Sequence, residues 1–233
     1  MTATLVKERP ILFSAPMVRA ILDGRKTQTR RIVKPQPPAD SCCPIIGSYG
    51  VDWDYCGART PASRNPYGVQ GNCLWVRETF DIVDDPAAYH KDDGPREVVE
   101  YEGEIYECDD AVRRGPNGER WVVDYAATPP RRAMDVAGVR KWRPSIHMPR
   151  WASRITLEIE SVRVERVQEI SEADAAAEGV GGMRDMRFAV ALGNLHSTAH
   201  RPNFADLWNS INGSGSWELN PWVWVLTFKR GTP

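Results

Sequence analysis

The strongest constraint on the fold is the alternating stretch over residues 153–167. Apolar and polar residues alternate from Ile155 to Glu160, further valines follow, and a β-bulge is expected at Ser161. A period of two predicts a long strand with one buried face. Apart from Thr227, residues 222–228 are apolar at both alternating sets of positions, which predicts a final, largely buried strand. The chain is therefore expected to build a sheet around these two strands.

A helix-to-strand corner near the N-terminus is the second feature. Ser14 suits the N-cap of a short amphipathic helix, and Gly24 suits its left-handed C-cap. The β-prone residues 27–33 follow, so Lys26 falls at the corner, with Thr29 alternating behind it. A lysine, a hydroxyl and an arginine at such a corner can line a small polar pocket. A solvated basic turn is the alternative interpretation.

Two more short helices are predicted in the C-terminal half. Ser171 and Asp174 resemble a capping box, which opens a helix over residues 173–178 that Gly179 closes. Apolar residues at helical spacing predict another helix from about residue 202 to residue 212.

The remaining segments are interpreted as insertions. Residues 34–71 contain many Pro and Gly residues and predict a long loop, whereas short strands within residues 81–150 predict a side sheet. The order of elements predicts an α+β fold, a small, partly open β-barrel flanked by short helices. We expect one domain over residues 1–233, with the barrel core at about 10–33, 72–80 and 151–230 and the insertions at about 34–71 and 81–150.

The formal net charge of −1 conceals strong segregation of charge. Residues 1–34 hold eight Lys and Arg against two acids, and residues 111–166 hold twelve against six. Residues 81–110 hold twelve acids against two bases. The basic parts allow a polyanionic partner such as single-stranded nucleic acid, although segregated charge is also common on ordinary protein surfaces.

Several classes of protein are not favoured. The sequence contains no apolar run of about 18 residues, so it predicts no membrane span. The first ten residues lack the apolar core of a signal peptide. The five cysteines are therefore expected to be reduced thiols of a cytoplasmic protein. Their spacing, the scattered histidines and the lack of a phosphate-binding loop predict neither a metal site nor a cofactor. The oligomeric state is not indicated.

The corner also carries a family resemblance. Gly24-x-Lys26-x-x-Thr29-x-Arg31 resembles the G-x-K-x-x-[E/T]-x-R signature of ASCH domains, which belong to the PUA-like β-barrel superfamily. With Thr at the sixth position, it resembles the small bacterial N4-acetylcytidine amidohydrolases. Roughly half of the chain is similar to ASCH-type proteins of bacteriophages and prophages, over residues 11–34, 74–80, 142–180 and 221–230.

The resemblance implies a hydrolase and assigns its catalytic residues. Lys26 corresponds to the lysine that accepts a proton, Thr29 to the nucleophile and Glu178 to the glutamate that donates a proton. Glu172 and Glu169 are the alternatives for the glutamate. A threonine hydroxyl needs a nearby base to act as a nucleophile. A lysine can serve as that base, because burial and neighbouring positive charges favour its neutral form.

A second group of residues is expected to bind substrate or nucleic acid. Residues 142–151 mix tryptophans with arginines and a histidine, which suits stacking on bases and contacts to phosphates. These tryptophans are equally suited to cover the end of a barrel. The binding residues we predict are Gly24, Arg25, Arg31, Trp75, Arg143, His147, Arg150 and Trp151.

Two functions follow as expectations. The first is an amidohydrolase that removes an acyl group from a modified pyrimidine nucleoside similar to N4-acetylcytidine, free or within RNA. The second is a non-catalytic PUA-like module that binds RNA or modified nucleic acid. The Lys26 and Thr29 pair favours the enzyme, whereas the length of the chain and its basic stretches favour the binding module.

Overall fold

The structure of the protein is a computed structural model. It describes residues 7–37, 43–47, 50–55, 58–83, 98–101, 104–107, 112–114, 116, 120–128, 142–181 and 199–231. The chain divides into two compact units. The first comprises residues 1–9, 20–74 and 157–231, and the second comprises residues 10–19, 75–156 and 232–233.

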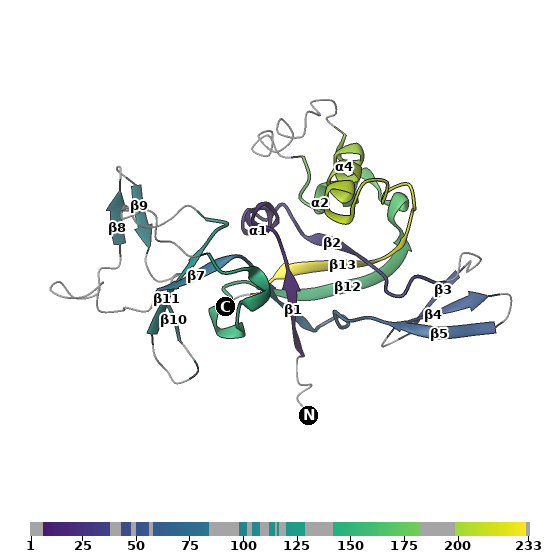
Figure 1. Ribbon diagram of the computed structural model, residues 1–233, viewed down its shortest axis with the longest axis horizontal. Coiled ribbons are helices and arrows are strands. Elements are labelled where there is room, and N and C mark those ends of the chain that lie inside the picture. Colours follow the sequence, from purple (N-terminus) through teal and green to yellow (C-terminus); the bar gives the residue numbers. More distant parts are fainter. Residues whose placement is uncertain are drawn as a thin grey trace. The chain divides into compact units, whose positions relative to one another are not determined.

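A five-stranded sheet contains the strands expected over residues 27–33, 153–167 and 222–228, together with strands over residues 8–12 and 73–77, the first of which the sequence did not predict (Figure 1). Its strands are β1 (Glu8–Leu12), β2 (Gln28–Ile32), β6 (Cys73–Arg77), β12 (Thr156–Arg166) and β13 (Trp222–Arg230), in the order β1-β6-β12-β13-β2. β13 pairs antiparallel with both β12 and β2. Bonds from Cys73 N to Lys7 O and from Phe13 N to Arg77 O give β1 and β6 a parallel register, so the sheet is mixed.

The two strands that dominate the sequence are confirmed. β12 is eleven residues long, and its register against β13 shifts between Ile159 and Ser161, where the bulge was expected. β13 is buried on both faces, from Trp222 to Leu226. It forms the centre of the first unit because one face carries helices and the other carries a cluster of aromatic and aliphatic side chains.

The predicted helices are also confirmed, with small shifts at their ends. They are α1 (Ala15–Leu22), α2 (Glu172–Ala177) and α4 (His200–Asn212), and a 3-10 turn, η5 (Val167–Glu169), precedes α2. Phe204 and Trp208 of α4 pack with Val223 and Val225 of β13 in one buried cluster. This cluster places α4 on the face of β13 that carries Val223 and Val225.

Residues 34–71 are not the long loop that their composition predicts. They form a second sheet of three antiparallel strands, β3 (Cys43–Gly47), β4 (Gly50–Tyr55) and β5 (Ala58–Arg64). Pro44 lies in β3 and Pro61 in β5, and these are the two edge strands of that sheet. An edge strand tolerates proline because one side of its backbone needs no partner in the ladder. The prolines therefore mark edges and do not exclude strands.

The second unit carries the short strands expected within residues 81–150. These are β7 (Phe80–Val83), β8 (Val98–Tyr101), β9 (Glu104–Glu107), β10 (Val112–Arg114) and β11 (Arg120–Tyr125), with 3-10 turns η3 (Ser145–His147) and η4 (Arg150–Ala152). β11 pairs with β7 and β10, and β8 pairs with β9. Phe80, Val123, Tyr125, Met148 and Ala152 form the core of this unit.

The fold is thus of the mixed α+β class, with short helices beside a mixed sheet. Among the strands that the structure describes, this sheet does not close into a barrel. The expectation of one domain over the whole chain stays a prediction. Within the described residues, no helix has the length and apolar character needed to cross a membrane.

Candidate functional site

The corner after α1 is fixed by its own backbone. Gly24 adopts a left-handed φ of 73°, and the amides of Arg25 and Lys26 both donate to Ala20 O at 2.9 Å. This capping turns the chain sharply from α1 into β2. Lys26 then forms an isolated antiparallel bridge with Glu178, which places the end of α2 beside the corner.

The side chains of Lys26 and Glu178 meet in the interior of the first unit. Lys26 Nζ lies 2.7 Å from Glu178 Oε2, and the two side chains are 1% and 4% exposed. The ammonium also donates to Gln28 O at 2.7 Å and to Glu178 O at 2.9 Å. Three acceptors thus lie within reach of a group that has three N–H donors. The result is a buried, tightly held ion pair.

The environment of this pair shifts the protonation of the lysine. Burial lowers the pKa of Lys26 below 10.5, and the nearby guanidinium groups of Arg31 and Arg30 lower it further. The carboxylate of Glu178 opposes this shift without cancelling it. Lys26 therefore gives up its proton more readily than an exposed lysine, as a general base requires.

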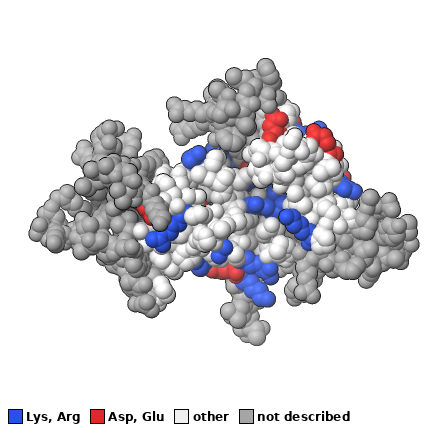
Figure 2. Space-filling view, viewed as in Figure 1, with Lys and Arg blue, Asp and Glu red and all other residues white. Residues whose placement is uncertain are grey.

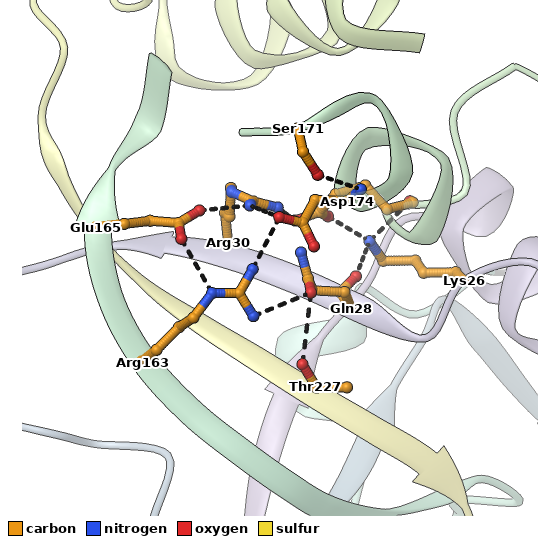
Figure 3. A network of polar contacts seen from close by, with 9 residues as sticks. Lys26, Gln28, Arg30, Arg163, Glu165, Ser171, Asp174 and Thr227 are labelled. Atoms are coloured by element: carbon orange, nitrogen blue, oxygen red, sulfur yellow. Dashed lines mark hydrogen bonds and ion pairs between the residues drawn. The ribbon is translucent and has the colours of Figure 1, made fainter. Parts of the chain in front are cut away.

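A polar network extends from the ion pair along β2 (Figure 3). Arg30 donates to Glu178 Oε1 at 3.2 Å and also contacts Glu165 and Asp174. Arg163 donates to the same two carboxylates at 3.0 Å. The network balances three cations (Lys26, Arg30 and Arg163) against three carboxylates (Glu165, Asp174 and Glu178). Such charge balance offsets much of the cost of burial.

The sequence interpretation missed Arg30 and Arg163 as partners. Arg30 and Arg163 both pair with Val225, so they flank it in one row across three strands. Directly paired residues project from the same face of a sheet. The alternation along β2 indicates that Arg30 shares a face with Gln28, but only the register reveals the row with Arg163.

Thr29 is buried on β2, with 3% of its surface exposed. It pairs with Leu226, and Arg31 pairs with Trp224, so alternation places both on the face opposite Arg30. The carbonyl of Gln28, which accepts a hydrogen bond from Lys26 Nζ, belongs to the peptide group that ends at Thr29 N. The Lys26 ammonium therefore lies close to the backbone of the predicted nucleophile. Its partner Glu178 contacts Arg30, so the Thr29 side chain lies on the face of β2 opposite this network.

The other predicted residues of the corner have defined places. Arg25 Nη1 donates to Gly179 O at 3.2 Å, and Arg25 Nη2 lies 3.1 Å from Asp23 Oδ2. Burial lowers the pKa of Arg31, whereas the interactions with Tyr67 and Glu178 raise it. Burial has the opposite effect on the Tyr67 phenol and raises its pKa, because it disfavours the charged form of both groups. Arg31 is thus a half-buried cation.

The alternative glutamates serve other contacts. Glu172 accepts hydrogen bonds from the first amides of α4, including His200 N at 2.7 Å. Glu169 accepts from Arg166 N at 2.9 Å in the cap of η5. Of the three glutamates weighed from the sequence, Glu178 is the one that pairs with Lys26.

The remaining predicted residues belong to the second unit. Trp75 is buried, and the Arg77 guanidinium lies 4.7 Å from the centre of its ring. Arg143, His147 and Arg150 are exposed, whereas Trp151 is half-buried against the core of this unit. Trp75 thus packs as a core residue, and the other four present side chains at least partly to solvent.

Comparison with known proteins adds no relative. None of the protein-family models, curated proteins or solved structures compared with the chain matches it. Among the described residues, no three His, Cys, Asp or Glu side chains are grouped in a way that could hold a metal ion.

Proposed function

We propose that the protein is an amidohydrolase that removes the acyl group from an N4-acylated pyrimidine nucleoside. The observation that carries this proposal is the buried pair of Lys26 and Glu178, which lie 152 residues apart in the sequence. The family resemblance assigns both residues to one catalytic site. The resemblance of residues 24–31 to ASCH domains of the PUA-like superfamily supplies the substrate class.

The proposed reaction uses the three residues in sequence. Thr29 Oγ attacks the carbonyl carbon of the amide while its proton passes to neutral Lys26 through a bridging water, because the Thr29 side chain lies on the face of β2 opposite Arg30. The carbon–nitrogen bond then breaks, Glu178 protonates the departing N4 amine, and the acyl group remains as an ester on Thr29. Water cleaves this ester, which releases a carboxylic acid and restores the hydroxyl.

The ion pair can prepare both groups at once. Transfer of one proton over the 2.7 Å from Lys26 Nζ to Glu178 Oε2 produces a neutral amine and a neutral carboxylic acid. These are the base and the acid that the reaction needs. Burial lowers the pKa of Lys26 and so favours loss of its proton.

The proposal is tested by incubating the protein with N4-acetylcytidine, both free and within RNA, and measuring cytidine by chromatography. We expect cytidine and acetate in equal amounts from at least one substrate. Thr29→Ala should abolish the reaction, and Thr29→Ser should retain part of it, with unchanged melting temperatures as the control for folding. A wild-type protein that releases no cytidine from either substrate contradicts the proposal.

One observation favours a second candidate, a non-catalytic PUA-like module that binds RNA or modified nucleic acid. The ammonium of Lys26 has three acceptors in Gln28 O, Glu178 O and Glu178 Oε2, an arrangement that also suits a purely structural ion pair. Under this candidate, the same incubation yields no cytidine, while the protein retains affinity for the acetylated RNA.

A further inference from the structure

The backbone of residues 142–151 is anchored to the core of the second unit by hydrogen bonds and by one buried side chain. Arg143 exchanges two backbone hydrogen bonds with Phe80, at 2.8 and 3.2 Å. Pro144 and Pro149 precede the 3-10 turns η3 and η4, and Met148 between them is 1% exposed in the core. The segment is thus anchored at its start and at its middle.

The side chains that project from this segment are basic or apolar. Trp142 is 39% exposed and Ile146 is 57% exposed. The exposed members of the segment with a basic side chain are Arg143, His147 and Arg150. Residues 142–157 contain no Asp or Glu. Together, the exposed Trp142, Arg143, Ile146, His147 and Arg150 form what we name the 142–151 surface.

A further guanidinium joins this surface from β6. Arg77 Nη1 donates to Ile146 O at 3.3 Å, so its cation lies against the backbone of η3. On the face drawn in Figure 2, the described surface shows more Lys and Arg than Asp and Glu.

We propose that the 142–151 surface binds single-stranded nucleic acid. Arg77, Arg143 and Arg150 supply cations for phosphates, and Trp142 supplies an exposed ring on which a base can stack. Stacking requires an unpaired base, which favours a single strand over a duplex. The anchored backbone reduces the conformational entropy that binding must remove. This inference is independent of the proposed deacylation, since it concerns unmodified strands and other residues.

The test is a fluorescence anisotropy titration of the whole protein with labelled single strands of oligo-dT and oligo-rU, and with a duplex of matched length. With three phosphate contacts at about 0.7 each, the slope of log affinity against log salt should be about −2. Affinity should then fall about 20-fold between about 50 and 200 mM salt. The two single strands distinguish DNA from RNA as the preferred partner, and the duplex should bind more weakly.

Variants assign the binding to this surface. Trp142→Ala should weaken binding at least about fivefold, whereas Trp142→Phe should retain most of it. Arg143→Gln combined with Arg150→Gln should flatten the salt slope to about −0.7. Arg230→Gln, at an exposed position of β13, is the control for loss of one charge and should bind like the wild type.

Two results overturn the inference. The inference is overturned if neither single strand binds at about 50 mM salt, and an acidic protein is then the expected partner of this surface. Binding that none of the Trp142 and arginine variants alters also overturns it, because the strand is then held elsewhere. Either result can occur whether or not the protein releases cytidine from N4-acetylcytidine, so the two proposals fail separately.

Discussion

Breaking the buried pair by Glu178→Gln should destabilise the protein strongly. The substitution keeps the size of the side chain but removes the charge that lies 2.7 Å from Lys26 Nζ. The ammonium, with 1% of its side chain exposed, then keeps the uncharged acceptors Gln28 O and Glu178 O. Removing one partner of a buried ion pair typically costs about 3–5 kcal/mol. For a chain of this length, that loss corresponds to a melting temperature about 6–20 °C lower.

The assay is a double-mutant cycle followed by thermal unfolding. Lys26→Met alone leaves the Glu178 carboxylate with the Arg30 guanidinium 3.2 Å away. Glu178→Gln combined with Lys26→Met removes both charges, so its cost should be smaller than the sum of the two single costs by about 0.5–3 kcal/mol.

An exposed pair provides the matched control. Lys229 Nζ lies 3.2 Å from Glu158 Oε2, and the two side chains are 55% and 42% exposed. Water screens such a pair, so Glu158→Gln should cost less than about 1 kcal/mol. The reasoning is refuted if Glu178→Gln melts as close to the wild type as Glu158→Gln does, or if the two buried substitutions are additive.

Three further predictions follow from the same region. Gly179→Ala should destabilise by about 2–5 kcal/mol in chemical denaturation, because Gly179 has a φ of 83° and a new Cβ would lie 3.0 Å from both Ala20 Cβ and Lys26 Cβ. Gly24→Ala, with a φ of 73° and open space, should cost only about 1–2 kcal/mol, and equal costs would contradict the packing argument. Partial burial acts to raise the pKa of Asp174, but Arg163 and Arg30 lower it more, to below 3.8. Its stabilisation is therefore complete above pH 3.8 and disappears as the pH falls through the lower folded-state pKa. Below pH 3.8, the melting temperature of Asp174→Asn should consequently fall less steeply with pH than that of the wild type. Equal falls would show that Asp174 does not stabilise the protein through its charge. Finally, kcat/KM for deacylation should rise with pH along a limb whose midpoint lies below 10.5, because burial lowers the pKa of Lys26 and the neutral amine is the base. A rate that falls with pH over that limb would exclude Lys26 as the base.

Local patterns along the sequence predicted most of the helices and strands. The capping of α2 by Ser171, the bulge at Ser161 and the left-handed Gly24 each follow from interactions between neighbouring residues. The helix α4 was predicted as well, but Ile211 at the end of its apolar stripe is 55% exposed. The periodicity thus predicted the helix but not the exposure of its last turn.

Features that depend on pairing between distant segments could not be predicted in this way. The row of Arg30, Val225 and Arg163 exists only because β2, β13 and β12 adopt one particular register. The strands of residues 43–64 are not predicted from the sequence, because a segment rich in proline and glycine is typical of a loop. Lys26 and Glu178 were predicted through a family resemblance, and no pattern of spacing links residues so far apart.

The most direct test of the central claim is the rate at which Lys26→Arg hydrolyses N4-acetylcytidine compared with the wild type. Arginine retains the positive charge beside Glu178 but does not release its proton at accessible pH. If Lys26 is the base for Thr29, the variant should fold with a similar melting temperature and lose turnover. Combining it with Thr29→Ala should then cost little more than either change alone, because the two residues act as one unit. If the wild type hydrolyses the substrate and Lys26→Arg does so at a comparable rate, Lys26 is not the base, and the pair at the corner is structural.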